Sequence, residues 1–304
     1  MNRGYIKTVF FVLSLVVCAI NTTLASQPAP KAANKVKTNE QKKAAADAKR
    51  EEYKRMLCKD PEESQLAMDH ANGYATLLLK IAENMDDFTL GHKYGEYCES
   101  YSKKLEHAEI ERFHGTIKGH YMYSSTVNNI WDYADSQKLD FKFIIGNATR
   151  IYNPNLVMFE KVRSDEMSSH YKKKYAIGAK VQISDDVTVI LCPTLAIKYE
   201  LDIHGNINTK EMLENAKKIN HDGVNLDEAL SNLNSNMSGI IIKKADNDMI
   251  NITYINFFLN YDRNIDYYNE LKQGAYMAKS ILHIAFRGGQ NKSKHTSIRS
   301  LLNL

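Results

Sequence analysis

The stretch YAIGAKVQIS, residues 175–184, decides the fold of this chain because an apolar side chain recurs at every second position. Side chains of a β-strand alternate between two faces, so this period predicts a strand with one apolar face and one face that tolerates water. The turn residues Ser184, Asp185 and Asp186 then lead into a second apolar run, residues 187–192. Together the two runs predict a β-hairpin.

More strands of the same kind lie before and after this hairpin. Residues 238–244 and 249–258 predict a second hairpin, because the Asx residues between them suit a tight turn. Residues 107–117 predict a further strand, although their apolar and polar side chains alternate less regularly. Residues 150–162 predict a strand that bends at Pro154, since proline donates no hydrogen bond to a ladder. The chain therefore predicts an antiparallel sheet.

Three segments predict helices, because their apolar residues are spaced three and four positions apart: residues 63–85, 124–138 and 266–286. Helices and sheet together predict an α+β fold. The last helix has small side chains in the middle of its apolar face, so it would lie close to the sheet or leave room beside it. These small residues are Gly274, Ala275 and Ala278.

The two ends of the chain differ in composition from its middle. A basic start, a short apolar run and small residues predict a secretory signal in residues 1–25, and hence a secreted protein. Residues 26–57 are basic and poor in large apolar side chains, which predicts a flexible linker or a solvated helix. We expect one folded domain over residues 58–289 and a basic tail over residues 290–304.

Charge argues against one class of partner. The net charge is +4, but the basic excess lies in the ends of the chain, and the body between them is acidic. A folded nucleic-acid binder needs a basic patch on a shaped surface, so nucleic acid is not expected as a partner. The basic ends could touch an anionic membrane surface transiently. We expect a monomer.

The cysteines leave two alternatives open. Cys18 belongs to the predicted signal, so three cysteines remain. Cys58 and Cys98 could pair in an oxidising compartment, or all three thiols could be free, and Cys192 lies in an apolar strand that predicts a buried thiol. The sequence has no CxxC spacing and no HExxH motif, so we predict no metal site.

The sequence contains few signs of a catalytic site. The sequence contains no GxSxG, P-loop or GxGxxG motif. If residues 107–117 form a strand, His107, Glu109 and Glu111 share one face and His114 lies on the other. We expect the acidic face to be solvated and His114 to lack a neighbouring carboxylate. General acid–base catalysis needs such a pairing, so we predict no enzyme and no cofactor.

Three strings carry a resemblance to a known family: RIYNPNLVMFEKV, residues 150–162; YAIGAKVQISDDVTVI, residues 175–190; and MSGIIIKKADNDMINITYI, residues 237–255. They resemble the Fam-A proteins of the malaria parasites (Plasmodium). The predicted order of helices and strands also resembles the StAR-related lipid-transfer (START) domain.

This resemblance implies a START-like helix-grip fold, in which a curved antiparallel sheet wraps around a long C-terminal helix and an apolar tunnel lies between them. It implies a secreted carrier that holds a phospholipid as cargo, phosphatidylcholine in particular, and moves it between membranes. It also implies a location in the parasitophorous vacuole or in the infected host cell. The C-terminal helix would act as the lid of the tunnel.

Such a tunnel needs apolar walls for acyl chains, aromatic faces for choline and a basic partner for phosphate. The candidates for wall or aromatic cage are Trp131, Tyr152, Phe159, Tyr175 and Tyr254. The candidates for the phosphate are Arg150 and Arg163. The candidates on the lid are Gly274, Ala275 and Ala278.

A second hypothesis gives the same fold a different role. The chain could be a host–parasite interaction protein or a surface antigen that uses the fold without transferring lipid. Bulky residues that fill the tunnel would favour this hypothesis, and the small face of the helix over residues 266–286 argues against it.

Overall fold

The computed structural model describes residues 47, 51–93, 98–135, 146–164, 171–192, 196–199, 208–216, 225–233 and 235–259. Apart from residue 47, they all belong to one compact unit, Lys49–Leu304. Several predicted features lie outside the described residues: the signal over residues 1–25, the helix over residues 266–286 with Gly274, Ala275 and Ala278, and the tail over residues 290–304.

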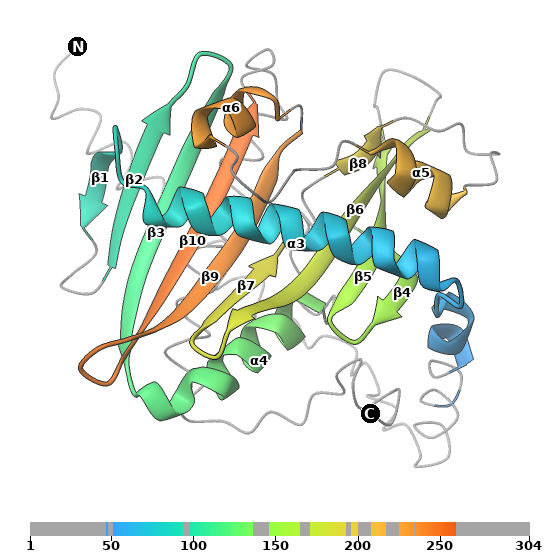
Figure 1. The fold of residues 1–304 in the computed structure, drawn as a ribbon, viewed down its shortest axis with the longest axis horizontal. Helices are drawn as coiled ribbons and strands as arrows, with labels where there is room; N and C mark the ends of the chain where they lie inside the picture. Colours follow the sequence, from blue (N-terminus) through green and yellow to red (C-terminus); the bar gives the residue numbers. More distant parts are fainter. Residues whose placement is uncertain are drawn as a thin grey trace, which may run out of the picture. The chain divides into compact units, whose positions relative to one another are not determined.

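One antiparallel sheet organises this unit (Figure 1). Its strands are β1 (Thr89–Lys93), β2 (Cys98–Lys104), β3 (Ala108–Lys118), β4 (Gly146–Asn153), β5 (Leu156–Ser164), β6 (Tyr171–Ser184), β7 (Val187–Leu191), β8 (Ala196–Tyr199), β9 (Met237–Ala245) and β10 (Met249–Leu259). The strand order is β1-β2-β3-β10-β9-β7-β6-β5-β4, and β8 pairs with β6 off this path. The pairing of β3 with β10 therefore joins the first and last parts of the described fold.

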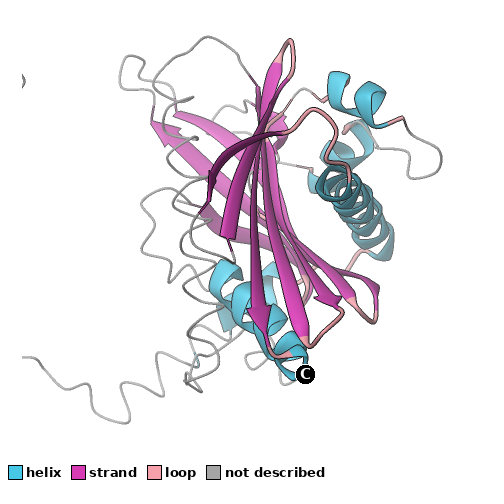
Figure 2. Ribbon diagram, turned by 90° about the vertical axis from the view of Figure 1, so that its left-hand side faces the viewer, coloured by secondary structure: helices cyan, strands magenta, loops and turns pink. Residues whose placement is uncertain are grey.

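Helices cover both faces of the sheet (Figure 2). They are α3 (Pro61–Glu83), α4 (Tyr123–Asp135), α5 (Thr209–Asn215) and α6 (Leu226–Ser231), with a short 3₁₀ helix, η1 (His120–Met122), before α4. The long α3 crosses one face together with α5 and α6, and α4 lies on the other. We call these the α3 face and the α4 face. The predicted α+β class is confirmed, and the element order from α3 to β10 is that of a START-like fold.

Helix α3 begins where its sequence supplies a cap. The Asp60 carboxylate accepts hydrogen bonds from the backbone N–H groups of Glu62 and Glu63, and Pro61 occupies the first turn. A side-chain cap satisfies N–H groups that have no partner inside the helix, and proline has no N–H to leave unpaired there. The position of the α3 start is therefore encoded locally.

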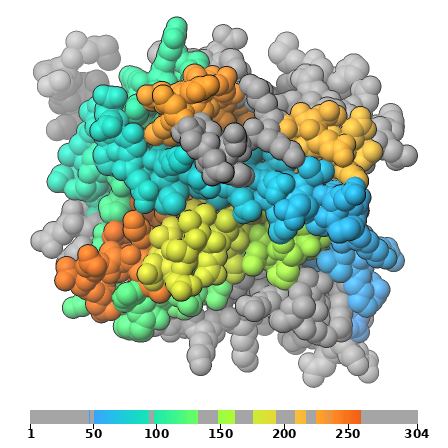
Figure 3. Space-filling view, viewed as in Figure 1, coloured from blue at the N-terminus to red at the C-terminus, as the bar shows by residue number. Residues whose placement is uncertain are grey.

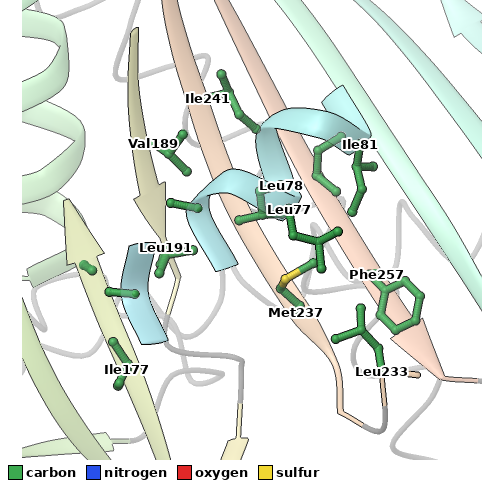
Figure 4. Close-up of a cluster of buried hydrophobic side chains, with 14 of the residues drawn as sticks. Leu77, Leu78, Ile81, Ile177, Val189, Leu191, Leu233, Met237, Ile241 and Phe257 are labelled. Atoms are coloured by element: carbon green, nitrogen blue, oxygen red, sulfur yellow. The ribbon is translucent and has the colours of Figure 1, made fainter. Parts of the chain in front are cut away.

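The larger hydrophobic core lies between α3 and the sheet (Figure 4). Leu77, Leu78 and Ile81 of α3 pack against sheet residues that include Ile241 and Phe257. The space-filling view shows α3 side chains meeting those of β7 and β9 along this face (Figure 3). Apolar burial of this extent is the main stabilising contribution to such a fold.

The deciding stretch, residues 175–184, forms the C-terminal part of β6, and its burial differs from the prediction in one respect. Tyr175, Ile177 and Ala179 are buried on the α3 face, as the alternation predicts. The intervening Ala176 and Gly178 are buried as well, so the prediction of a water-tolerant second face is wrong at these positions. A side chain at Gly178 would meet the Phe159 ring, which covers it. Local periodicity does not reveal what covers the second face.

The predicted hairpins are present, but several elements have no signal in the sequence. The pairs β6–β7 and β9–β10 are antiparallel hairpins, as predicted. Residues 150–162, predicted as one strand that bends at Pro154, instead belong to two antiparallel strands, β4 and β5, with Pro154 in the turn between them. The strands β1, β2 and β8 and the helices α5 and α6 were not predicted. Every residue of β1 is exposed and most of β2 is polar, so neither strand shows the apolar alternation that a half-buried strand requires.

The packed part of the chain begins before Cys58, where the sequence analysis placed the domain boundary. Residues 51–56 are helical, and Leu57 forms a parallel bridge with Ile151 of β4. Tyr53, Met56 and Leu57 pack against a small core of Ile151, Val157 and Phe159. The end of the predicted linker is thus part of the fold at the β4 edge.

The pairing of Cys58 with Cys98 is not formed, and both thiols are free. Cys58 donates its backbone N–H to Ile151 of β4, whereas Cys98 begins β2 near the other edge of the sheet. Six strands lie between β2 and β4. Neighbouring strands lie about 4.8 Å apart, whereas a disulfide requires Cα atoms within about 7 Å. None of the three described cysteines forms a disulfide, and Cys192 is buried, as its apolar strand predicts.

Gly239 of β9 sets how closely α3 approaches the sheet. A Cβ atom there would lie 2.4 Å from Leu78 Cδ1 and 2.9 Å from the Ile190 carbonyl oxygen. Because that oxygen belongs to the backbone of β7, we expect Gly239→Ala to lower the free energy of unfolding by about 1–3 kcal/mol. Urea denaturation measures the change.

The control is Gly91→Ala in the exposed strand β1, where the nearest atom would be the Ser100 hydroxyl oxygen at 3.3 Å. We expect this variant to change stability much less. Equal effects of the two substitutions would contradict a close approach of α3 at Gly239.

Candidate functional site

The structure divides the predicted site residues between the two faces. Trp131, Phe159 and Tyr254 lie on the α4 face, in the clusters opposite α3. Arg150, Tyr152 and Tyr175 lie on the α3 face. The remaining candidates cannot be placed in a site: the side chain of Arg163 and the residues Gly274, Ala275 and Ala278 lie outside what the structure describes.

Arg150 and Tyr152 belong to a buried polar network around Glu63 of α3. The Glu63 carboxylate, 3% exposed, accepts hydrogen bonds from Arg150 Nε at 3.0 Å and from Arg150 Nη2 at 2.6 Å. It also accepts from the hydroxyls of Tyr152, at 3.1 Å, and Thr209, at 2.6 Å. Arg150 is thus paired with a carboxylate, and its predicted role at a lipid phosphate is replaced by a structural one that ties α3 to β4 and α5.

The protonation state of Glu63 follows from this network. Burial alone would raise its pKa, but the hydrogen bonds from Arg150 and Thr209 outweigh burial and lower the pKa below its usual value. Burial and the Glu63 charge raise the pKa of Tyr152, which therefore stays a hydroxyl donor. The network holds a charged carboxylate inside the fold at neutral pH.

Tyr175 also has a structural role on the α3 face. Its ring is 2% exposed within the core, and its hydroxyl donates to Glu160 Oε2 at 2.6 Å. Burial and this hydrogen bond raise its pKa. The alternation of side chains along β6 correctly predicted that Tyr175 is buried. The structure places it on the opposite face of the sheet from Trp131 and Tyr254.

The α4 face is an apolar wall built from helix and sheet. Val127, Ile130 and Trp131 of α4 pack with residues of β3, β7, β9 and β10. The sheet residues of this cluster are Ile117, Ile190, Ile240, Ile242, Ile250, Ile252 and Tyr254. Farther along the same face, Val157 and Phe159 of β5 continue the apolar surface.

Two polar contacts fix α4 on this wall. At its first residue, the Tyr123 hydroxyl shares a hydrogen bond with Thr188 Oγ1 at 2.9 Å. At the other end, Trp131 Nε1 donates to the Pro154 carbonyl at 3.1 Å, in the β4–β5 turn. Trp131 is therefore a wall residue whose indole N–H is satisfied by the protein.

A row of polar side chains crosses the α4 face beside the wall. In the pairing register, Glu111 of β3 lies opposite Asn256 of β10, and Asn256 lies opposite Ser238 of β9. Asn256 Nδ2 donates to Glu111 Oε2 at 3.2 Å. Asn256 is 7% exposed and Ser238 is 1% exposed. We call Glu111, Asn256 and Ser238 the polar row.

Aromatic residues flank the polar row on both sides. Phe113 and Tyr254 form the adjacent pair in the β3–β10 register, and Glu109 and Phe258 form the next pair on the other side. Residues two apart on a strand share a face, so these rings lie on the same face as Glu111. The row is thus a polar strip within an aromatic and aliphatic surface.

The carboxyl of Glu111 is in an unfavourable setting for a charge. Burial is the largest influence and raises its pKa, the hydrogen bond from Asn256 partly opposes this, and the Glu109 charge raises it further. Within the described residues no salt bridge involves Glu111. The expectation that this acidic face is solvated is therefore wrong for Glu111. Sequence alternation identified the face but not its burial.

His114 lies on the α3 face and has a carboxylate neighbour that the sequence analysis did not expect. Its Nδ1 hydrogen-bonds with Thr253 Oγ1 at 2.9 Å, and Glu99 of β2 lies opposite it in register. Burial and the nearby Arg112 lower the pKa of His114. Arg112 itself lies over the Tyr101 ring at 5.3 Å. Strand β2 was not predicted, which is why Glu99 was missed.

Two further properties hold within the described part of the chain. No group of three His, Cys, Asp or Glu side chains is arranged to hold a metal ion. No described helix combines the length and the apolar character needed to cross a membrane.

Comparison with known proteins gives similarities of fold. The human StAR-related lipid transfer protein 5 structure matches at a TM-score of 0.41 and 9% identity, over 74% of this chain and 99% of that one. A StAR-related lipid transfer protein from Xanthomonas axonopodis matches at a TM-score of 0.40 and 10% identity, over 67% of this chain and 100% of that one. No family model and no curated protein sequence matches the chain.

Arg150→Met tests the structural role of the Glu63 network. It leaves a buried carboxylate without its cation, so we expect a loss of about 3 kcal/mol at pH 7, at the low end for a buried pair because Arg150 is 31% exposed. The pKa of Glu63 is lowered from the usual 4.5 in the folded protein. The pair therefore stabilises the wild type fully above pH 4.5, and the stabilisation is lost as pH falls and the carboxylate is protonated. Chemical denaturation at pH 7 and pH 4 should show the deficit shrinking at pH 4. A deficit that does not depend on pH would contradict the ion pair.

Glu111→Gln tests the burial of the second carboxyl. The raised pKa of Glu111 means that the wild type loses stability as pH rises above about 4.5, where the unfolded carboxyl ionises. We expect the variant, free of lipid, to be more stable than the wild type by about 1 kcal/mol at pH 7, because it removes a buried charge. The gain should vanish at pH 4. Destabilisation at both pH values would contradict this assignment.

Proposed function

We propose that this protein is a secreted lipid carrier that holds a phospholipid, phosphatidylcholine, on the α4 face and moves it between membranes. The observation that carries the proposal is the composition of that face, in which an extended apolar wall lies beside a short polar row. Acyl chains need an apolar surface, and a headgroup needs a few polar groups. The fold-level likeness to StAR-related lipid transfer proteins agrees with this choice without deciding it.

The α3 face is unsuited to a ligand because the protein itself fills it. The side chains of α3, α5 and α6 form a continuous buried core with the sheet, and Gly239 brings Leu78 against the backbone. The polar groups there are paired with one another, as in the Glu63 network. A lipid on that face would have to displace α3.

On the α4 face the energetics favour a lipid. Each methylene that leaves water for an apolar surface contributes about 0.8 kcal/mol, so two acyl chains supply ample affinity. The apolar side chains of this face include Ile240 and Ile252 of the sheet and Trp131 of α4. In the proposed complex an acyl chain packs against them. Specificity then depends on the few polar groups, as in most sites for small molecules.

The finer features of the proposal come from the sequence. The resemblance to the Fam-A proteins of Plasmodium supports phosphatidylcholine as cargo, and the predicted signal in residues 1–25 supports secretion, to the parasitophorous vacuole or the infected cell. We propose a monomer that touches membranes transiently, binds no nucleic acid, uses no cofactor and catalyses no reaction. Its chemistry is binding and release.

The alternative is an interaction protein or surface antigen that uses the same fold without lipid. It would be favoured if the apolar wall were closed by the protein itself. The two hypotheses therefore differ in one measurable property, which is whether the purified protein contains lipid.

Native mass spectrometry of the purified protein, followed by lipid extraction and a vesicle-to-vesicle transfer assay, tests the proposal. We expect one phospholipid per chain, and transfer of phosphatidylcholine between vesicles. Gly178→Leu places a side chain on the α4 face beside Phe159, where the nearest atoms belong to a movable ring. It should reduce lipid occupancy at least about threefold while the chain stays folded.

Gly91→Leu in the exposed strand β1 is the matched control, and its lipid occupancy should equal that of the wild type. A wild-type protein that is empty and moves no lipid would overturn the carrier proposal and favour the interaction protein.

A further inference from the structure

We propose that the Glu111–Asn256 pair selects lipids by the charge of their headgroup, accepting a cationic ammonium and rejecting a net anionic headgroup. This inference rests on the proposed carrier function. It names the substrate class as zwitterionic phospholipids, and it places the cationic end of the headgroup beside Glu111 and Asn256 of the β3–β10 pair, away from Arg150 and Tyr152.

The first step is the geometry of the pair. Asn256 donates to one oxygen of Glu111, Oε2, at 3.2 Å, so the amide orients the carboxyl group. A carboxylate has about four lone-pair sites on its two oxygens. The pair can therefore bind a further donor or a cation while its own hydrogen bond is kept.

The second step is the charge around Glu111. Its strand neighbour Arg112 points to the α3 face, where it lies over Tyr101. Glu109, which shares a face with Glu111, adds a second negative charge. The cross-strand partner of Glu109 is Lys104 at the exposed end of β2. Within the described residues no salt bridge involves Glu111 itself, so a ligand cation next to the half-buried carboxyl would stabilise its ionised form.

The third step is the aromatic setting. Phe113 and Tyr254 flank the pair on one side and Phe258 on the other. Aromatic faces attract ammonium groups, most strongly where water is excluded. Phe258 is 1% exposed and Tyr254 is 5% exposed, so this surface is shielded from solvent. A carboxylate next to aromatic rings suits a quaternary or primary ammonium, and the same carboxylate repels a headgroup that carries only negative charge.

The test is a transfer assay with the full chain and vesicles that donate a single labelled lipid: phosphatidylcholine, phosphatidylethanolamine or phosphatidylglycerol. We expect the wild type to transfer the two zwitterionic lipids at least about tenfold faster than phosphatidylglycerol, because like charges at a desolvated site are strongly disfavoured. Glu111→Gln removes the charge and keeps the shape, so it should bring the ratio close to one. If that variant misfolds, Glu111→Ala serves the same purpose.

The matched control is Glu160→Gln, which neutralises a carboxyl on the α3 face that accepts one hydrogen bond from Tyr175. It should keep the wild-type ratio. Lipid transfer by Glu111→Gln with the wild-type headgroup ratio would overturn this inference and leave the carrier function standing. A wild type that transfers none of the three lipids would overturn both proposals.

Discussion

The burial of α3 against the sheet is the interaction on which the rest of the structure depends. One 23-residue helix lies across the strands from β5 to β10, and its apolar stripe fills that face of the sheet. The fit is close because Gly239 has no side chain where Leu78 lies. With one face closed in this way, a ligand is left with the opposite face.

The buried polar groups on the two faces differ because α3 closes one face of the sheet and not the other. On the α3 face a buried carboxylate, Glu63, receives hydrogen bonds from Arg150, Tyr152 and Thr209 and stays charged. On the α4 face another carboxyl, Glu111, has an amide as its hydrogen-bond donor and a raised pKa. Removing a partner from a buried, hydrogen-bonded charge destabilises a fold, whereas a buried carboxyl with a raised pKa lowers stability when it ionises and is more common at functional sites. This contrast distinguishes a structural network from a candidate binding site.

Several residues that looked alike in the sequence have different roles for this reason. Tyr175 and Tyr254 both lie in strands of alternating character, yet they face opposite sides of the sheet. Arg150 lies in a string that resembles a lipid-transfer family, and it is the ion-pair partner of α3. Glu111 was predicted to be a solvated acid, and it forms one end of the polar row, where Asn256 donates to it. The type of residue gave no way to tell these cases apart, because the neighbours that decide them lie far away in the chain.

The sequence by itself determined the α+β class, the helix over α3, the hairpins β6–β7 and β9–β10, and an interruption of the strand at Pro154. Each of these is a local matter: an alternation, a cap at Asp60 or a turn residue acts over a few positions. Tertiary structure decided which side of each strand is closed, since that depends on α3 and α4 packing on opposite faces. It also decided that β1 and β2, which lack apolar alternation, extend the sheet, and that Cys58 and Cys98 lie too far apart to pair. The candidate site belongs to this second group, because Glu111 and Asn256 are 145 positions apart and meet only through the pairing of β3 with β10.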